Sequence, residues 1–402
     1  MAIVLPDGLD GPESLDAYRS RGGYDALEAA RKLGPLGVIE TVEASGLRGR
    51  GGAAYPTGRK WRQVREAAGD GKYLVVNGAE GEPGSMKDRA TMARIPHAVI
   101  EGMILAAHAI GALEAKVYVN DEFDDAVAAM RAALAEAQEA GLLARLGDVP
   151  LTVELVPETH VYIAGEETAL LNVLMGKPAV PWHKPPYPTE KGLNGLPTAV
   201  NNVETLAQAA TAVRLGADAY RAQTPMLFSI SGDVAKPGVH EFPLGTPLSS
   251  LIEAAGGMAD GQAFQAVLPG GYSSPMLGAE HLHLPLDYDS VKAAGSGLGC
   301  SIIVVGESRS LASVAYDVME FFARESCGRC PTCVRGTRSL ADALMDVRDG
   351  RVLGPEEGAA LLAQAQRLRH KGICSFLDTA SRFTTDALPA LAVPTEQEAG
   401  TA

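Results

Sequence analysis

The sequence predicts a multidomain chain in which an α/β domain, a small α+β domain and an all-α domain follow one another. Three observations predict this order: apolar strands alternate with helices up to about residue 180, short strands dominate residues 226–305, and helical patterns follow residue 311. Strands that alternate with helices are typical of a parallel sheet. A chain of 402 residues is long enough for two or three domains, and we expect them at residues 1–220, 221–308 and 309–402.

The expected elements of the first domain come from hydrophobic periodicity. Helices are predicted at residues 24–44, 96–111, 122–140 and 166–175 and from Asn201 to Val213. Strands are predicted at residues 73–77, 115–119 and 151–156. Thr57 can cap a further short helix that begins near Arg59. These elements predict a parallel sheet with helices between its strands.

The rest of the chain changes from strands to helices. Strands are predicted at residues 226–232, 238–242, 264–268 and 301–305, with one helix at 247–255. That mixture indicates a small α+β domain. Four helices are predicted at residues 311–324, 331–346, 355–369 and 376–388, which indicates a small four-helix bundle.

Composition limits the partners and the compartment. The net charge of −14 and the isoelectric point near 5.1 argue against a general surface for nucleic acids or anionic membranes. No apolar stretch is long enough for a transmembrane helix, and the first residues lack the pattern of a signal peptide. Five cysteines in so long a chain do not indicate a disulfide scaffold. We therefore expect the reducing cytoplasm.

Four of the five cysteines form one pattern. Cys327, Cys330 and Cys333 are spaced C-x2-C-x2-C, and Cys374 follows far downstream. Four thiolates are what a [4Fe-4S] cluster needs, and a tight triplet with a remote fourth cysteine is typical of ferredoxins. Four cysteines also suit structural zinc, although zinc sites usually pair two C-x2-C units. The spacing favours the cluster and leaves zinc open, and Cys300 is assigned no ligand role.

A glycine-rich stretch at residues 46–58 carries local positive charge. Gly49, Gly51 and Ala54 fit the dinucleotide fingerprint G-x-G-x-x-G/A. The preceding residues look helical, whereas the fingerprint requires a strand, so the ordinary Rossmann assignment fails. Glycines still let the backbone approach a ligand closely, and Arg50 and Lys60 suit a phosphate or dinucleotide. The alternative is a tight surface turn with solvated basic residues.

Three further segments place polar residues where strands end or helices begin. They are Asn77-Gly78-Ala79-Glu80-Gly81-Glu82, Tyr162-Ile163-Ala164-Gly165-Glu166-Glu167 and Asn201-Asn202. In α/β sheets, ligands bind at the carboxyl ends of the strands, and a helix N-terminus can take a phosphate. Each segment has a structural alternative, which is a Gly/Pro turn for the first and helix capping for the others.

Taken together and in this order, these segments resemble the NADH-oxidising flavoprotein subunit of respiratory complex I. The same module serves NAD-dependent formate dehydrogenases and bidirectional hydrogenases. The resemblance covers roughly residues 30–380, with matching stretches at 46–61, 77–89, 162–171, 184–204, 286–299 and 325–335 and with Cys374. It implies a Rossmann-like FMN-binding domain, a ubiquitin-like domain of the soluble-ligand-binding β-grasp type and a helical domain with one [4Fe-4S] cluster. It also implies hydride transfer from NADH to FMN and single-electron transfer through the cluster.

The resemblance also implies the site residues, position by position. The implied FMN contacts are Gly49, Arg50, Gly51, Lys60, Asn77, Tyr162, Gly165, Glu166, Glu167, Asn201 and Asn202. The implied nucleotide contacts are Gly52, Tyr55, Glu80, Glu82, Lys184 and Tyr187. The cluster ligands are Cys327, Cys330, Cys333 and Cys374. The reaction needs no catalytic side chain, because the cofactors carry the redox chemistry, and Glu80 is the nearest candidate for one.

Several positions depart from the family pattern. Tyr55 and Tyr187 stand where the family offers phenylalanines to the adenine ring, and tyrosine keeps the stacking face. Ala79 replaces an aspartate, and Gln63 replaces a second stacking aromatic residue. The glycine-rich lead-in before Tyr162 is replaced by Pro157-Glu158-Thr159-His160. These changes bear on nucleotide affinity more than on the cluster, and they indicate a diverged member of the family.

The resemblance implies protein partners as well. A thioredoxin-like [2Fe-2S] subunit is expected, together with a further iron–sulfur, molybdopterin or hydrogenase subunit. Glu82 would repel a 2′-phosphate, which favours NADH over NADPH. Two other functions remain open at this stage: a non-catalytic electron-transfer or scaffold subunit that has lost NADH oxidation, and a zinc-stabilised structural protein.

Overall fold

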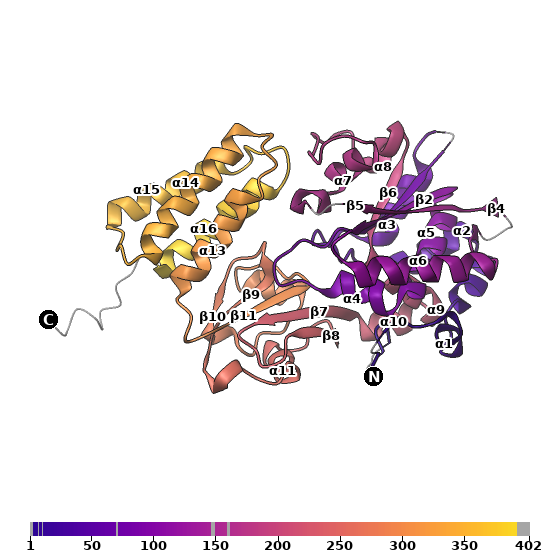
Figure 1. The fold of residues 1–402 in the computed structure, drawn as a ribbon, viewed down its shortest axis with the longest axis horizontal. Helices are drawn as coiled ribbons and strands as arrows, with labels where there is room; N and C mark the ends of the chain where they lie inside the picture. Colours follow the sequence, from indigo (N-terminus) through magenta and orange to yellow (C-terminus); the bar gives the residue numbers. More distant parts are fainter. Residues whose placement is uncertain are drawn as a thin grey trace.

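The computed structural model describes residues 3–6, 8–9, 11–69, 71–145, 149–158 and 161–391. Three parts follow one another along the chain, as Figure 1 shows: a sheet covered by helices, a second smaller sheet and a group of four helices. The multidomain α/β architecture predicted from the sequence is confirmed. Thr159 and His160, at which the lead-in to Tyr162 departs from the family pattern, lie outside the described residues.

The first sheet has four parallel strands in the order β5-β2-β1-β6. They are β1 (Tyr73–Gly78), β2 (Glu114–Asn120), β5 (Thr152–Glu158) and β6 (Thr198–Asn202), and a small separate hairpin is formed by β3 (Ala144–Arg145) and β4 (Val149–Pro150). Tyr73 pairs with Glu114 on one side and Thr198 on the other, so the carboxyl ends of β1 and β6 lie side by side. This is the edge at which α/β sheets bind ligands.

Strand β6 corrects the sequence prediction. Asn201 was expected to begin a helix, but it lies in the strand, and Asn202 caps the helix that begins at Val203. The strand is only five residues long, and its polar end runs directly into the helix, so periodicity alone does not separate the two. Thr57 is corrected too, because it is the first residue of its helix and Pro56 occupies the cap position.

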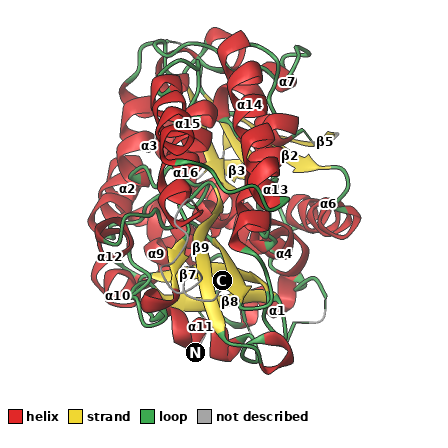
Figure 2. Cartoon of the chain, turned by 90° about the vertical axis from the view of Figure 1, so that its left-hand side faces the viewer, coloured by secondary structure: helices red, strands yellow, loops and turns green. Residues whose placement is uncertain are grey.

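Helices cover both faces of this sheet (Figure 2). Their bounds are α1 (Leu15–Ser20), α2 (Asp25–Ala44), α3 (Thr57–Glu66), α4 (Lys87–Arg94), α5 (Pro96–Ile110), α6 (Asp124–Glu139), α7 (Glu167–Leu174), α8 (Pro188–Lys191), α9 (Val203–Leu215) and α10 (Ala217–Gln223). Short 3-10 turns lie at η1 (Tyr162–Gly165) and η2 (Leu193–Gly195). Helix α5 is buried along nearly its whole length, and it packs against α2 and α9 in the core.

The second sheet is mixed, with the order β10-β9-β11-β7-β8. Its strands are β7 (Pro225–Gly232), β8 (Gly238–Pro243), β9 (Phe264–Tyr272), β10 (Leu277–Gly278) and β11 (Ser301–Gly306). Only the β11–β7 pair is parallel. The connections contain α11 (Leu248–Ala254), α12 (Tyr288–Ala293) and the turns η3 (Ala259–Gly261) and η4 (Ala279–His281). Phe228, Leu251 and Ile302 are fully or almost fully buried in its core.

The last part consists of α13 (Leu311–Arg324), α14 (Pro331–Arg348), α15 (Pro355–Leu368) and α16 (Phe376–Leu391). Each begins and ends within a few residues of its prediction. Phe322, Leu340, Leu377 and Phe383 form the core between the helices. Across the described ranges, no helix is long and apolar enough to cross a membrane.

Candidate flavin, nucleotide and iron–sulfur site

The predicted polar segments meet at the carboxyl edge of β1 and β6. The side-chain amide of Asn77, near the end of β1, donates to the carbonyl of Gly165 at 3.1 Å. The side chain of Asn202, at the end of β6, lies against Gly51, where an added Cβ would approach the Asn202 Cβ to 3.4 Å. The fold therefore brings together three segments that are far apart in the sequence.

The glycine-rich loop has the shape of a cradle. The two ends of the loop are joined by a hydrogen bond that the Gly49 amide donates to the Tyr55 carbonyl at 2.9 Å. At the tip, Gly52 adopts a φ of 101°, a left-handed conformation that favours glycine. A Cβ added at Gly52 or Gly165 would meet no atom within 4 Å, so both backbones border open space. The loop follows the end of α2, so the expectation that a helix precedes it is confirmed.

Four predicted residues form a charged cluster beside this cradle. The Lys184 ammonium lies 2.9 Å from Glu166 Oε1 and 2.8 Å from Glu167 Oε1. Lys60 lies 3.7 Å from Glu167 Oε2 and donates to the Val200 carbonyl at 3.0 Å. Burial lowers the pKa of Lys60 although Glu167 opposes this. Burial would raise the pKa of Glu167, but Lys60 and Lys184 outweigh it and hold that pKa below its usual value.

The two candidate glutamates after β1 are occupied by protein groups. Glu80 accepts the backbone amides of Asp88 and Arg89 at 3.1 Å, so it caps helix α4. Glu82 accepts the Tyr162 hydroxyl at 2.8 Å and the Ser273 amide at 2.9 Å. Burial raises the pKa of Glu82 although these hydrogen bonds act in the other direction. In this state neither carboxylate is free of protein hydrogen bonds.

The side chain of Arg50 does not line the cradle. Its guanidinium is buried and donates to the Pro225 carbonyl and the Tyr288 hydroxyl, both at 3.0 Å. Glu204 lies 3.8 Å from its Nε. The Arg50 amide donates to Thr205 Oγ1 at 2.8 Å. The side chain of this residue therefore anchors the glycine-rich loop to the second sheet and faces away from a ligand in the cradle.

A buried ion cluster that the sequence did not reveal lies beneath Asn202. Lys87 Nζ lies 2.6 Å from Asp88 Oδ1 and 3.0 Å from Glu204 Oε2. Asp88 Oδ2 accepts the Asn202 amide at 2.6 Å. The Cys300 thiol, from the second sheet, donates to the Arg50 carbonyl at 3.5 Å. Adjacent Lys87 and Asp88 after a Gly/Pro turn are the only sequence signal for this cluster.

The aromatic candidates lie apart from this polar core. The Tyr55 hydroxyl donates to Gln63 Oε1 at 3.2 Å, so the two altered positions contact each other. The Arg59 guanidinium lies over the Tyr55 ring, 5.9 Å from its centroid. Tyr187, at the N-cap of α8, is 51% exposed. Asn201 accepts the Trp61 indole N–H at 3.0 Å.

The four predicted cysteine ligands belong to, or pack against, one hydrophobic cluster of the helical part. Cys333 is buried and the other three are half-buried. Burial raises the pKa of Cys374 to about 11, and the neighbouring Cys327 and Cys333 add to the shift. Within the described chain, no three His, Cys, Asp or Glu side chains gather closely enough to hold one metal ion. A [4Fe-4S] cluster takes four thiolates, and this donor set fits it.

Aromatic rings connect the two candidate sites. The Tyr162 ring centroid lies 4.9 Å from that of Phe321 on α13 and 5.9 Å from that of Phe376. Phe376 follows Cys374 by two residues, and Tyr162 precedes Gly165 by three.

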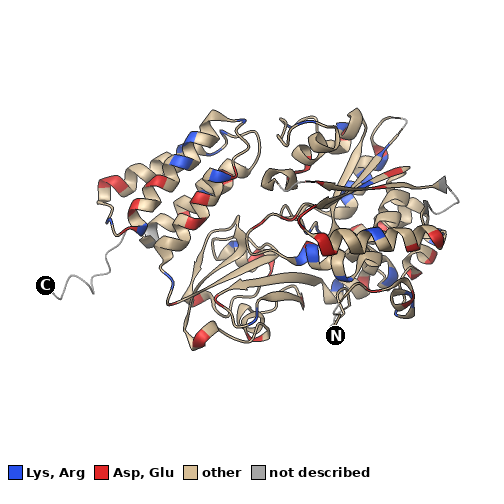
Figure 3. Ribbon diagram, in the orientation of Figure 1, with Lys and Arg blue, Asp and Glu red and all other residues tan. Residues whose placement is uncertain are grey.

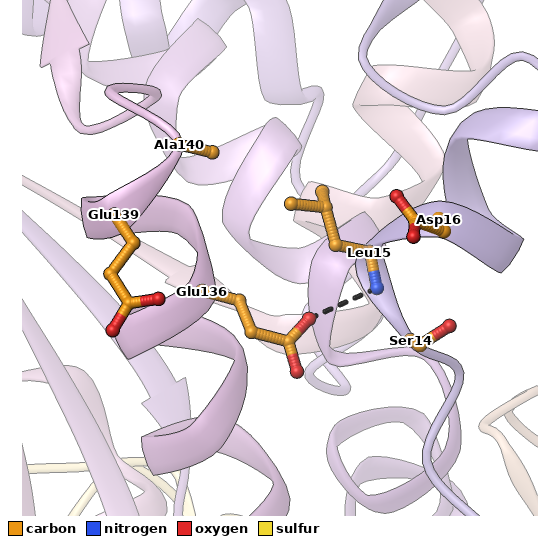
Figure 4. Close-up of a pocket in the computed structure, with 6 residues that line it drawn as sticks. All are labelled: Ser14, Leu15, Asp16, Glu136, Glu139 and Ala140. Carbon is orange, nitrogen blue, oxygen red and sulfur yellow. Dashed lines mark hydrogen bonds between the residues drawn. The ribbon is translucent and has the colours of Figure 1, made fainter.

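A pocket elsewhere, where α1 meets α6, is lined by Ser14, Leu15, Asp16, Glu136, Glu139 and Ala140 (Figure 4). It contains none of the predicted site residues.

Family models match three stretches of the chain in sequence. Residues 42–211 match the Nuo51 FMN-binding domain, residues 227–272 match an SLBB domain, and residues 313–392 match the NADH-ubiquinone oxidoreductase-F iron–sulfur binding region. The fold and the cysteine set, with these matches, define a flavoprotein subunit that binds FMN and a [4Fe-4S] cluster. Zinc, the alternative left open by spacing, does not fit an iron–sulfur binding region.

Comparison with whole proteins identifies the family. The F 2 subunit of the NADH-quinone oxidoreductase of Rhizobium meliloti is 43% identical over 362 residues, covering 86% of each chain. The F subunit of the same enzyme in Streptomyces coelicolor is 40% identical, covering 87% of this chain and 81% of its own. A crystal structure of an NAD+-reducing [NiFe]-hydrogenase in the H2-reduced state matches with a TM-score of 0.85 and 33% identity, covering 98% of this chain and 68% of that one. The chain belongs to the family of NADH-quinone oxidoreductase F subunits.

Proposed function

We propose that this chain is the NADH-oxidising subunit of a multisubunit oxidoreductase and that it binds FMN and one [4Fe-4S] cluster. Bound FMN supplies hydride chemistry, and the cluster carries single electrons onward. One observation carries the proposal: the cradle, the Asn77 and Asn202 amides and the Lys60–Glu167 pair meet at one sheet edge, and Tyr162 connects that edge to the cysteine-bearing helices.

We assign the site as follows. FMN contacts Gly49, Gly51, Lys60, Asn77, Tyr162, Gly165, Glu166, Glu167, Asn201 and Asn202, with Arg50 contributing through the loop that it anchors. The nucleotide contacts Gly52, Tyr55, Glu80, Glu82, Lys184 and Tyr187. The cluster is held by Cys327, Cys330, Cys333 and Cys374. Glu80 remains the nearest candidate for a catalytic side chain, although the reaction needs none.

The protein's own contribution is binding and orientation. Lys184 sits between two carboxylates, and Lys60 is held by Glu167 and a backbone carbonyl, so both cations are fixed before a ligand arrives. Fixed charges cost little reorganisation when an anionic ligand binds. The glycine-rich backbone allows a flat ring close to the sheet edge. The hydrogen bonds of Glu82 to Tyr162 and Ser273 would have to open for this carboxylate to contact a nucleotide.

We assign the domains to residues 1–220, 221–308 and 309–402. The mixed sheet and the SLBB match support a ubiquitin-like domain of the soluble-ligand-binding β-grasp type for the second. Four consecutive helices support a four-helix iron–sulfur bundle for the third. For partners we propose a thioredoxin-like [2Fe-2S] subunit and a further iron–sulfur, molybdopterin or hydrogenase subunit. A cytoplasmic location, peripheral to a membrane complex, remains a prediction.

Anaerobic purification followed by nucleotide titration tests the function. We expect about four iron and four sulfide per chain with no zinc, one FMN per chain, and bleaching of the flavin absorbance by NADH. A chain that binds FMN and the cluster but is bleached by neither NADH nor NADPH would instead be an electron-transfer or scaffold subunit. The replacements Ala79 and Gln63 are where such a loss would arise. Preferential bleaching by NADPH would contradict the NADH assignment.

A further inference from the structure

Three exposed cations flank the cluster cysteines. Arg329 lies between Cys327 and Cys330, Arg335 follows Cys333 by two residues, and Lys371 precedes Cys374 by three. All three side chains are exposed, and none forms an ion pair with a carboxylate of the described residues. Arg367, four residues before Lys371, is also exposed and unpaired within that part of the chain.

Five other arginines of the helical part form ion pairs. Charges of both signs alternate along this part of the molecule, as Figure 3 shows. The pairs are Arg324–Glu325 at 2.9 Å, Arg338–Glu320 at 2.7 Å, Arg348–Asp349 and Arg351–Asp346 at 2.8 Å, and Arg382–Asp386 at 3.6 Å. The cations beside the cysteines differ from these arginines because they form no ion pair with an acidic side chain of the described residues.

Arg329, Arg335 and Lys371 each lie close along the chain to a predicted ligand cysteine. Each is at most three residues from a ligand cysteine, and a chain spans at most about 3.5 Å per residue, so each Cα lies within about 10 Å of a ligand Cα. The four cysteines belong to one packed cluster of side chains in the helical part. A local basic surface thus borders the cluster site on a chain whose net charge is −14.

Apolar side chains are exposed on the same helix. Val334, beside Arg335, is 40% exposed, and Met345 on α14 is 37% exposed. Their spacing of eleven residues is three helical turns, so they lie on one face. Helix α14 runs along the outer edge of the group of four helices in Figure 1. Arginine, methionine and apolar side chains on one surface are typical of protein interfaces.

We propose that the surface formed by Arg329, Val334, Arg335 and Lys371 docks a partner protein whose redox centre is rimmed by Asp and Glu. The proposal rests on the proposed function, because it takes the cluster as the place where electrons leave the chain. Unpaired cations can meet carboxylates of a partner without breaking an internal ion pair. Complementary charges also speed and orient the encounter of two proteins. The basic surface would bring an acidic rim, and the acceptor within it, next to the cluster.

Zero-length cross-linking of the intact complex tests which groups meet. A carbodiimide joins a lysine ammonium to a carboxylate only where the two touch. We expect Lys371 to be coupled to an Asp or Glu of an electron-accepting subunit, as identified by mass spectrometry. Lys292, exposed on α12 of the second sheet, is the matched control and should give no such product. Coupling of Lys371 only to a second copy of this chain, or coupling of Lys292 alone, would overturn the proposal.

A second measurement uses variants of the holoprotein. Arg329→Gln, Arg335→Gln and Lys371→Gln are combined, and the control combines Arg338→Gln, Arg348→Gln and Arg351→Gln. We expect the first set to weaken binding to the remainder of the complex by about tenfold or more at low salt and to flatten its salt dependence. The control variant should leave the binding strength and its salt dependence nearly unchanged. Iron content and the electron paramagnetic resonance signal of the cluster verify that both variants are loaded.

Two outcomes separate this proposal from its alternatives. If binding is unchanged and only the midpoint potential of the cluster falls, the cations tune the cluster and dock nothing. Flavin bleaching by NADH should be the same in the wild type and both variants. A wild-type chain without bleaching or without a cluster would reject the proposed function itself, whereas unchanged binding in a fully active variant rejects only the docking surface.

Discussion

Individual side chains at the sheet edge differ in which protein groups hold them. Lys60 and Lys184 form ion pairs with Glu167 and Glu166, the residues that follow Gly165. Arg50 instead binds Pro225 and Tyr288, and Glu80 caps α4 in this structure. The family resemblance implied all four residues as ligand contacts. A sequence shows the position of a residue but not the direction of its side chain.

The reactivity of Cys300 gives the first prediction. Burial raises the pKa of this thiol to about 12, although Lys87 and Arg50 oppose the shift. Since the thiolate is the reactive form, Cys300 should not react with iodoacetamide in the native protein at neutral pH. In the metal-free chain, Cys327 and Cys330, which are half-buried like Cys300, should be labelled and serve as controls. Mass spectrometry of labelled peptides measures this, and native-state labelling of Cys300 would show that it is accessible.

The second prediction concerns pH and His97. This buried imidazole lies 2.9 Å from the Tyr24 hydroxyl and 3.1 Å from Glu136. Burial lowers its pKa, and Glu136 only partly opposes this. The unfolded chain therefore binds the proton more tightly, so stability should fall as pH drops below about 6.5. In urea unfolding at about pH 7.5 and about pH 5.5, His97→Gln should lose less stability between the two than the wild type. Equal losses of stability in the two proteins would mean that a group other than His97 causes the pH dependence.

At the scale of elements, the sequence predicts most helices and strands but not how they touch. Helices α13 to α16 were predicted nearly to the residue, because their apolar positions recur with the helical period. Strand β6 was not, because five residues between a proline-rich segment and a helix carry too little pattern. Helix α4 was also missed, although it supplies Lys87 and Asp88 beneath Asn202. Strand β6 and helix α4, which support the site residues, are thus the elements that the sequence pattern predicts least well.

The third prediction tests a close contact between α5 and α9. A Cβ added at Gly102, on α5, would fall inside the van der Waals radius of the Leu206 carbonyl on α9. Because backbone atoms cannot rotate away, Gly102→Ala should destabilise the protein by about 3 kcal/mol. Gly297→Ala is the control, since a Cβ there meets no atom within 4 Å. Denaturant unfolding of both variants measures the difference, and equal stabilities would mean that α5 and α9 can separate without cost.

In the molecule as a whole, polar contacts link the parts of the chain. Glu82 binds Ser273, the residue after β9, and also Tyr162, whose ring packs on the helical part. Arg50 reaches from the cradle to Pro225 at the start of β7. These contacts join residues far apart in the sequence, so no local pattern indicates them. The motifs picked out the segments that come together at the sheet edge, whereas the pairing of Arg50 with the second sheet could not be predicted without the fold.

The last prediction decides what Arg50 does. Arg50→Gln would remove one cation near Glu204, and the shorter side chain would no longer reach the Pro225 carbonyl. Because the site is buried, we expect the free energy of unfolding to fall by about 3 kcal/mol. Hydrogen exchange in β7 should rise, since that strand begins at Pro225. Arg62→Gln is the control, because Arg62 pairs with Glu43 at the surface of α3 and should change little. FMN content is measured in parallel.

If FMN is lost while hydrogen exchange in β7 and stability stay at wild-type values, the guanidinium contacts the flavin directly. If β7 loosens and FMN is retained at saturating concentration, Arg50 acts as the anchor that joins the cradle to the second sheet.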